Sequence, residues 1–372
     1  MALNLKNDRP SKQGFGCMRL PVRNGRAAEI DYKTAEEMID EAYIHGVNYF
    51  DTAYTYHEQK SEIFLGNVLK KYPRESYYLA DKMPGWLVKK REDAAEIFNT
   101  QQKRCQTDYF DFYLCHALSH DKLDVYEKEG VYEFLYQKKN QGVIRNLGFS
   151  FHDTPEVLEM ILDKYEWDFV QIQLNYLDWD RQEAKRLYEI LKKRNIPCTV
   201  MEPVRGGALA QLCPEAVEIL EKECPGRSPA SWALRFAAGL PGVMTVLSGM
   251  SDEAQVKENI NTLVTDFKPL SRSEQGVLMR ARDIYLQVMT IPCTDCKYCS
   301  GCPEWIDIPK IFSMYNDYKI SKHAETFKKD YQALGLANAD ACIRCGRCMR
   351  LCPQGIKIPE RLKEISILTK SI

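Results

Sequence analysis

Eight of the fourteen cysteines in this chain of 372 residues fall into two short runs near its C-terminal end. The first run reads CTDCKYCSGCP and the second reads CIRCGRCMRLCPQ. Their cysteines are Cys293, Cys296, Cys299, Cys302, Cys342, Cys345, Cys348 and Cys352. Thiolates are soft metal ligands, and cysteines three residues apart can face one metal group. The two runs therefore predict metal chemistry.

The second run has the spacing C-x2-C-x2-C-x3-C-P, which is the bacterial ferredoxin pattern for [4Fe–4S] clusters. In that pattern the fourth cysteine binds the other cluster, so we assign Cys352 to the first run and Cys302 to the second. The first run has two residues, not three, before its last cysteine. Two [4Fe–4S] clusters are the favoured interpretation. Zinc, which usually uses separate CxxC pairs, and disulfide bonds are the alternatives.

The residues between the two runs show helical periodicity at 308–320 and 323–336. Each run leads into a similar phrase, IDIPKIF after the first and IKIPERL after the second. Proline is favoured in the first turn of a helix, so both phrases predict a helix start and suggest an internal two-fold repeat. This part of the chain resembles the α-helical ferredoxin domains, in which helices separate the two cysteine runs.

A second set of side chains could carry acid–base chemistry: Asp51, Tyr56, Lys82 and His116. Each stands at or just after the end of a short apolar run. An ammonium beside a phenol favours the phenolate, so we expect a lowered pKa for Tyr56. A carboxylate would hold the lysine, and a histidine could hydrogen-bond a substrate oxygen. This set suits protonation of a carbonyl while a hydride arrives from a nicotinamide.

The runs that would position these side chains alternate with helical stretches. Strands are expected at 14–18, 47–52, 77–82, 110–116, 144–150, 169–175, 198–203 and 243–249. Amphipathic helices are expected at 31–46, 61–72, 154–165 and 181–195. Eight strands alternating with helices predict a (β/α)8 TIM barrel, whose chemistry lies at the carboxyl ends of the strands. A doubly wound open sheet is the alternative, which the lack of a G-x-G-x-x-G after an early strand disfavours.

The first 290 residues resemble the aldo-keto reductase superfamily in the phrases FDTAYTYHEQKSEIFLG, LADK, DFYLCH, GVIRNLGFS, QIQLN and TVMEPVRGGALA. The whole chain is similar to the iron–sulfur-bearing branch of that superfamily. The resemblance implies a catalytic tetrad of Asp51, Tyr56, Lys82 and His116, with Tyr56 as the general acid. It implies cofactor contacts at Ser150, Gln171, Asn175, Met201, Glu202, Pro203, Val204, Arg205, Gly206, Gly249, Glu258 and Asn259.

Three departures from the superfamily pattern bear on the cofactor. Phe151 stands where members often carry Asn, and Met201 stands where an aromatic residue commonly stacks on the nicotinamide. The loop after the eighth strand offers one cation, Lys257, for a 2′-phosphate, with Asp252 and Glu253 nearby. This favours NADH over NADPH but leaves both open.

Composition and charge limit the binding partners and the cellular location that we expect. A net charge of −1 offers no electrostatic case for binding nucleic acid or an anionic membrane. No apolar run reaches the roughly 18 residues needed to span a bilayer, and the N-terminus lacks the apolar core of a signal peptide. We therefore expect a cytoplasmic protein with a barrel domain at 1–280 and a ferredoxin-type domain at 281–372.

The expected function is NAD(P)H-dependent reduction of a carbonyl, or oxidation of an alcohol, by a protein that carries two [4Fe–4S] clusters. A nicotinamide delivers two electrons as a hydride, whereas a cluster usually moves one. A flavin could separate the two electrons, although the sequence shows no flavin fingerprint. Two alternatives stay open: an electron-transfer protein with a redox partner, in which the barrel docks or binds, and a non-enzymatic barrel braced by its clusters. The substrate and the oligomeric state stay open as well.

Overall fold

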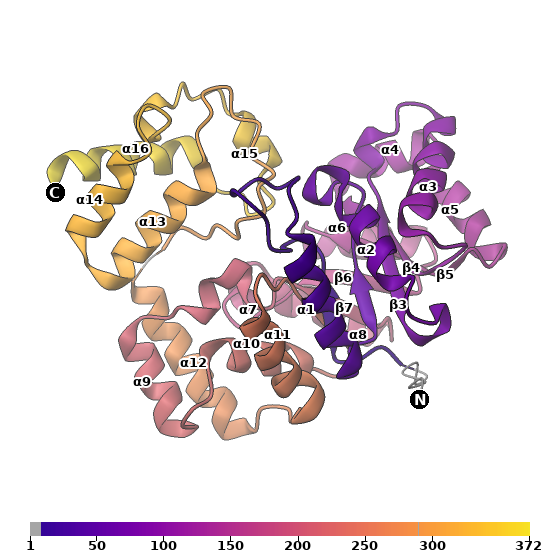
Figure 1. Ribbon diagram of the computed structural model, residues 1–372, viewed down its shortest axis with the longest axis horizontal. Coiled ribbons are helices and arrows are strands. Elements are labelled where there is room, and N and C mark those ends of the chain that lie inside the picture. The colour runs from indigo at the N-terminus through magenta and orange to yellow at the C-terminus, as the bar shows by residue number, and fades with distance from the viewer. Residues whose placement is uncertain (1–8, 289) are drawn as a thin grey trace. The chain divides into compact units, whose positions relative to one another are not determined.

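A computed structural model of the protein describes residues 9–288 and 290–372 (Figure 1). Within these residues eight strands form a closed barrel in chain order, and β1 pairs with both β2 and β8 to complete the ring. The strands are β1 (Gln13–Gly16), β2 (Tyr49–Asp51), β3 (Tyr78–Met83), β4 (Phe110–Leu118), β5 (Ile144–Phe151), β6 (Phe169–Gln173), β7 (Cys198–Met201) and β8 (Val243–Ser248). All neighbouring strands are parallel, which confirms the predicted barrel and rules out an open sheet.

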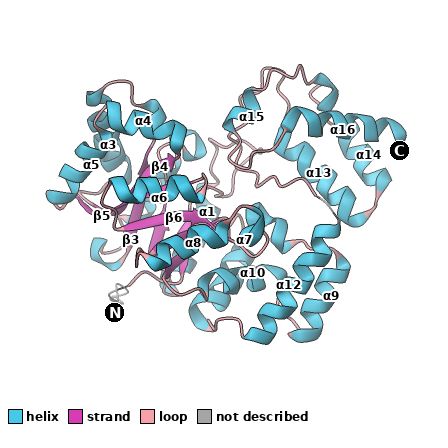
Figure 2. Ribbon diagram, turned by 180° about the vertical axis from the view of Figure 1, so that it is seen from behind, coloured by secondary structure: helices cyan, strands magenta, loops and turns pink. Residues whose placement is uncertain are grey.

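Helices alternate with the strands and surround them (Figure 2). They are α1 (Tyr32–Ile44), α2 (Ser61–Leu69), α3 (Arg91–Cys105), α4 (His120–Lys128), α5 (Val131–Asn140), α6 (Pro155–Lys164), α7 (Asp178–Arg181), α8 (Ala184–Lys193), α10 (Pro229–Ala238) and α11 (Glu253–Ile260). The four helices expected from periodicity appear as α1, α2, α6 and α8. In α8 the apolar side chains Leu187 and Leu191 recur one turn apart and are buried, which is the pattern that predicted it.

Side chains on a strand alternate between the inside and the outside of a barrel, so residues two apart share a face. A buried apolar layer consists of Tyr49, Ala80, Phe112, Leu114, Phe169 and Leu247. The residues two positions further along these strands include Asp51, Lys82, His116 and Gln171. The strand period therefore places the polar side chains one level above the apolar layer, at the carboxyl end of the barrel.

The chain divides into two compact units. The barrel unit comprises the residues up to Pro203 together with Ser231–Leu270, and the C-terminal unit comprises Val204–Ala230 and Ser271–Ile372. The expected division at residue 280 falls inside α12 (Arg272–Gln287), which packs against α9 (Pro214–Glu223) within the C-terminal unit. The segment that follows β7 is therefore part of the same compact unit as the cysteine runs.

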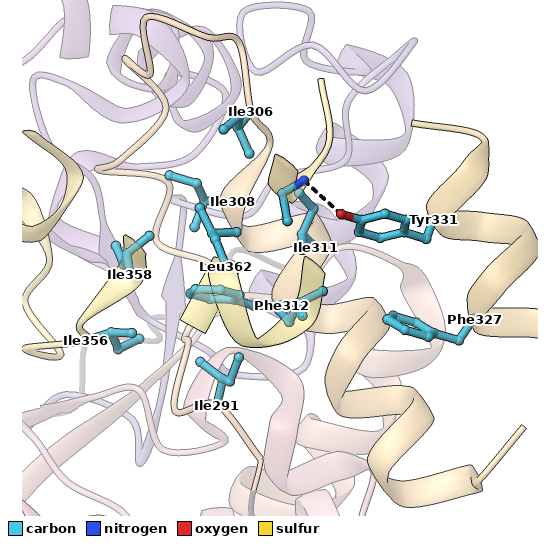
Figure 3. Packing of buried hydrophobic residues seen from close by; sticks show 12 residues of the cluster. Ile291, Ile306, Ile308, Ile311, Phe312, Phe327, Tyr331, Ile356, Ile358 and Leu362 are labelled. Carbon is cyan, nitrogen blue, oxygen red and sulfur yellow. Dashed lines mark hydrogen bonds between the residues drawn. The ribbon is translucent and has the colours of Figure 1, made fainter. Parts of the chain in front are cut away.

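The remaining helices of the C-terminal unit are α13 (Ile308–Ser321), α14 (Ala324–Gln332), α15 (Arg347–Leu351) and α16 (Ile358–Ser371). The helices α13 and α16 each carry a proline in the first turn, as the two similar phrases predicted. Buried apolar side chains on both sides of the cysteine runs form one core (Figure 3). The core is completed by a hydrogen bond from the Ala339 N–H to the Tyr331 hydroxyl, 3.1 Å long.

Among the residues that the structure describes, no helix is both long enough and apolar enough to cross a membrane.

Candidate active site and candidate metal centre

The predicted tetrad comes together at the carboxyl end of the barrel. Asp51 ends β2, while Lys82 and His116 lie near the ends of β3 and β4. Tyr56 begins a short 3-10 helix, η1 (Tyr56–Gln59), in the loop after β2. The Lys82 Nζ lies 4.9 Å from the centre of the Tyr56 ring, and the Tyr56 and His116 rings are 6.1 Å apart at their centres.

Lys82 and Asp51 form a buried ion pair. The Lys82 Nζ donates to Asp51 Oδ1 at 2.6 Å and to the Thr52 carbonyl oxygen at 2.8 Å. The lysine side chain is 0% exposed and the aspartate side chain 3%, so the pair is shielded from solvent screening. Burial raises the pKa of Asp51, and the lysine charge opposes that rise. The pair holds the ammonium in one position beside the phenol.

Tyr56 is half-buried, and its electrostatics differ from the expectation. Burial raises the pKa of Tyr56 well above its usual value, and the carboxylates of Asp51 and Glu202 raise it further, whereas Arg19 lowers it. The expectation of a lowered pKa was wrong, because the sequence showed the lysine but not the burial or the carboxylates around it. A phenol with a raised pKa is protonated at neutral pH, which is the form that a proton donor needs.

His116 is neutral at physiological pH. Burial lowers its pKa well below 6.5, and the charges of Lys82 and Lys122 lower it further. Among the described residues its Nδ1 is buried without a hydrogen-bond partner. A neutral imidazole can donate one N–H to a carbonyl oxygen without competing with Tyr56 for the proton.

The backbone is strained beside both aromatic groups. Three consecutive residues after Tyr56, namely His57, Glu58 and Gln59, have positive φ values of 50°, 50° and 70°. Ala117, directly after His116, has φ 53°, at a break in the β4–β5 register. For non-glycine residues a positive φ costs conformational energy, and such strained residues occur most often at functional sites.

Two of the predicted nicotinamide contacts lie on neighbouring strands, Ser150 next to the last residue of β5 and Gln171 in the middle of β6. The Ser150 Oγ accepts a hydrogen bond from the Ala117 N–H at 2.7 Å. The Gln171 amide nitrogen contacts the Met201 sulfur at 3.5 Å, and its Oε1 is buried without a partner among the described residues. A buried, unsatisfied amide oxygen is costly, and a carboxamide N–H of a nicotinamide would satisfy it. These residues fit the cofactor.

Asn175 is engaged within the protein. Its amide nitrogen donates to Asp178 Oδ2 at 2.7 Å and to the Glu202 carbonyl oxygen at 3.0 Å. Its side-chain oxygen accepts from the N–H groups of Leu177 and Asp178. These hydrogen bonds join the loop after β6 to the loop after β7, so Asn175 stabilises the conformation of both loops in this structure.

The other predicted cofactor residues fall in two groups. In the barrel unit, Glu202 pairs with Arg19 at 3.0 Å, Asn259 donates to Ser248 at 2.9 Å, and Gly249 lies against the Arg19 side chain. Pro203 is buried and Glu258 is half-buried in the same unit. Val204, Arg205 and Gly206 belong to the C-terminal unit, where a Cβ on Gly206 would lie 2.3 Å from the Thr294 carbonyl oxygen.

Sequence reasoning missed Arg19 and Lys122 as site residues. Arg19 follows β1, and Lys122 lies in α4 after β4. Each is one cation among many in the sequence, so neither had a local signal beyond its place after a strand. His57 contacts backbone groups at both ring nitrogens, with the Ala27 carbonyl oxygen at 2.8 Å and the Leu20 N–H at 3.2 Å.

The cysteines of the two runs line two cavities in the C-terminal unit. The first cavity is lined by Cys293, Cys296, Cys299 and Cys352, which is the set expected for one cluster. The second cavity is lined by Cys302, Cys345 and Cys348 from the other set, together with Cys299. Cys342 is absent from that lining, but its charge raises the pKa of Cys348, so the two sulfurs are neighbours.

The two cysteine loops repeat one backbone pattern. Positive φ values occur two and four residues after Cys293, at Asp295 and Lys297, and at the same offsets after Cys342, at Arg344 and Gly346. A further positive φ follows three residues after the last cysteine of each run. Left-handed residues alternating in a loop turn backbone N–H groups inward, toward sulfur ligands. The repeat suggested by the sequence is therefore present in the backbone.

All fourteen cysteines are free thiols in the structure. Burial raises the pKa of Cys293 and of Cys299 to about 12, and the nearby Cys296 and Cys352 thiolates add to the rise. Positive charge between these sulfurs would oppose both effects, so the donor set fits a bound metal group. In the described residues no three ligands converge on a single metal ion, whereas each thiolate of a cubane binds its own iron.

A closed (β/α)8 barrel with acid–base groups at the carboxyl ends of its strands is the arrangement of a TIM-barrel enzyme. Residues 13–275 match the model of the Aldo/keto reductase family, so the chain belongs to that family. Residues 292–356 match a 4Fe-4S dicluster domain. Both matches confirm the resemblance seen in the sequence.

Two curated relatives and two solved structures illustrate the similarity. The chain is 25% identical over 285 residues to L-galactose dehydrogenase of Arabidopsis thaliana, covering 71% of this chain and 88% of that protein. It is 28% identical over 219 residues to NADH-specific methylglyoxal reductase of Escherichia coli, covering 54% and 65%. Aldo-keto reductase AKR11C1 from Bacillus halodurans superposes with a TM-score of 0.61 at 26% identity, covering 73% and 92%. An aldo-keto reductase from Klebsiella pneumoniae in complex with NADPH has a TM-score of 0.60 at 20% identity, covering 74% and 90%.

Proposed function

We propose that the protein is an NAD(P)H-dependent aldo-keto reductase that reduces the carbonyl group of a small molecule, or oxidises the corresponding alcohol. The observation that supports this most is the cluster at the barrel mouth. A protonated phenol, Tyr56, stands beside a buried ammonium, Lys82, and a neutral imidazole, His116.

Tyr56 is the general acid in this proposal. As the carbonyl carbon is reduced, negative charge develops on its oxygen and the phenol hands over its proton. The phenolate that forms is stabilised by the Lys82 ammonium, which Asp51 and the Thr52 carbonyl hold in place. His116 donates a hydrogen bond to the same oxygen and orients the substrate.

Ser150 and Gln171 would hold the carboxamide of the nicotinamide, because the Gln171 oxygen is buried and unsatisfied. When bound, the reduced nicotinamide supplies the hydride. We favour NADH, since Lys257, the one cation expected near a 2′-phosphate, is already paired with Glu253 at 3.4 Å. The relative described as an NADH-specific methylglyoxal reductase supports the same choice.

We propose two [4Fe–4S] clusters, one on Cys293, Cys296, Cys299 and Cys352 and the other on Cys302, Cys342, Cys345 and Cys348. The two cavities and the repeated loop backbone support this count. Such clusters supply one-electron transfer when bound. The functional division proposed is a reductase domain to about residue 280 and a cluster domain at 281–372, in a cytoplasmic protein, since reducing compartments keep cysteines available for metal.

The test uses anaerobically purified protein with its iron retained. Oxidation of NADH and of NADPH is followed with methylglyoxal and a panel of small aldehydes and ketones. Tyr56→Phe is expected to lower kcat about 10²- to 10⁴-fold, the usual contribution of a general acid. Tyr136→Phe is the matched control, because its exposed hydroxyl bonds Glu166 away from the site. Equal activity of wild type and Tyr56→Phe would refute the proposal.

A second candidate is an electron-transfer protein whose clusters exchange electrons with a redox partner. A flavin or another two-electron centre would then be needed to pass the electrons of a nicotinamide to the clusters one at a time. The cysteine-lined cavities and the dicluster match favour this candidate. An anaerobic titration with NADH separates the two. Cluster bleaching by NADH without any carbonyl substrate would support electron transfer, whereas turnover with unchanged cluster spectra would support the reductase alone.

A further inference from the structure

Lys122 is a half-buried ammonium beside the proposed substrate site. Its Nζ lies 5.3 Å from the centre of the Trp86 ring, on α4 after β4. The Trp86 ring in turn lies 5.0 Å from the His116 ring, centre to centre. The Trp86 indole therefore contacts both the Lys122 ammonium and His116, the histidine proposed to orient the substrate.

No carboxylate neutralises Lys122 within the part of the chain that the structure describes. The acidic residues on its own helix are engaged elsewhere: Asp121 faces His120 at 3.4 Å, and Asp124 pairs with Lys128 at 2.8 Å. Asp153, which follows β5, accepts from the backbone N–H groups of His120 and Thr154. Since a half-buried cation without a counter-charge is costly, the site lacks one anion.

The other groups that sense Lys122 are also cationic or neutral. Its charge lowers the pKa of both His116 and His152, and burial lowers the pKa of Lys122 itself. The buried His116 and the half-buried His152 both lie within reach of the Lys122 charge, and Trp86 forms an apolar wall that is 39% exposed. This arrangement has positive potential and a flat aromatic surface, which together match an anionic organic molecule.

We propose that Lys122 binds a carboxylate on the substrate, so that the enzyme prefers carbonyl compounds that carry an acid group over neutral ones of the same shape. The proposal rests on the proposed reductase function and specifies its substrate class. A carboxylate paired with Lys122 would lay the rest of the molecule along Trp86 toward His116 and Tyr56. Lys122 is a binding residue here and takes no part in the proton transfer.

The test compares 4-carboxybenzaldehyde with benzaldehyde, which differ by the carboxylate alone, on the full protein with its iron retained. In wild type we expect kcat/KM to favour the acid. Lys122→Met should reduce that preference about 30-fold, the size of one charge-assisted hydrogen bond, and the change should appear in KM for 4-carboxybenzaldehyde. Lys122→Arg should keep most of the preference. Lys128→Met, an exposed lysine on the same helix, is the control that should change nothing.

Binding of benzoate and of benzamide, measured by calorimetry, tests the site without turnover. Wild type should bind benzoate more tightly than benzamide, and Lys122→Met should abolish the difference. Equal benzoate binding by wild type and Lys122→Met, or none by wild type, would overturn the inference even if neutral aldehydes are reduced. Loss of all aldehyde reduction together with intact, Lys122-dependent benzoate binding would instead refute the reductase function and keep the anion site.

Discussion

Replacing Lys82 by methionine should separate the electrostatic role of this lysine from its role in packing. Methionine has a similar length and no charge, so the variant leaves the Asp51 carboxylate buried without the ammonium that lies 2.6 Å away. Removing one partner of a fully buried pair typically costs about 3 to 5 kcal/mol. Both side chains are at most 3% exposed, so we expect Lys82→Met to lose about 4 kcal/mol of unfolding free energy at neutral pH.

Urea unfolding followed by tryptophan fluorescence is a suitable assay. Four of the five tryptophans, at 86, 167, 179 and 232, lie in the barrel unit, so the signal reports mainly on that unit. The loss should shrink as the pH falls toward 5. Burial already raises the folded pKa of Asp51, and without the ammonium that pKa rises further; such a group destabilises the folded state most at high pH, where it is charged.

The double variant Asp51→Asn/Lys82→Met completes the design. Removing both charges should recover at least half of the stability that Lys82→Met loses, while reductase activity stays absent. A loss below about 1 kcal/mol in Lys82→Met, or no recovery in the double variant, would refute the argument that this pair is buried and coupled.

Three further predictions concern other parts of the chain. Gly206→Ala should destabilise the C-terminal unit by roughly 2 kcal/mol more than Gly207→Ala, because only the first Cβ meets the Thr294 backbone; urea-induced bleaching of the visible cluster absorbance measures this. Cys352→Ala should lower the iron content by about half and change one cluster signal in paramagnetic resonance, and loss of both signals or of neither would contradict the assignment. Burial lowers the pKa of His152 to about 4, so the folded state should lose about 2 kcal/mol, allowing for partial exposure, as the pH falls from about 6.5 to 4, and His152→Gln should remove that loss in the same fluorescence assay.

The two parts of the molecule pose a problem of electron number. A carbonyl reduction moves two electrons as a hydride, and an iron–sulfur cluster moves one. The barrel site needs no cluster for its acid–base chemistry, since Tyr56, Lys82 and His116 all come from the barrel unit. The anaerobic titration described above is therefore informative whichever way it turns out, because it measures whether the two chemistries are linked.

The order of the strands and helices could be predicted from the sequence because it depends on local periodicity. Short β-type runs marked the eight strands, and apolar side chains three and four apart marked helices such as α8. The two-residue period of a strand places Asp51, Lys82 and His116 at one end of the barrel, since each follows an apolar residue by two positions. The cysteine spacing was equally local, and it indicated which sulfurs lie together in the first cavity.

The protonation states and hydrogen-bond partners of the site residues could not be predicted, since they depend on neighbours from strands that are distant in the sequence. The raised pKa of Tyr56 follows from its burial and from Asp51 and Glu202, which outweigh the opposing charge of Arg19. The Asn175 amide donates to Asp178 and to the Glu202 carbonyl oxygen, contacts that the sequence alone did not indicate.

Short-range spacing thus predicted the barrel and the cysteine runs, and together with the resemblance to the aldo-keto reductases it predicted which side chains form the acid–base groups. The protonation of those groups, the grouping of residues 204–230 with the cysteine runs, and the lack of a carboxylate partner for Lys122 among the described residues became visible in the folded molecule alone. The physical reason is that burial and electrostatic energy are sums over all surrounding atoms, and folding brings those atoms together from positions that no local pattern connects.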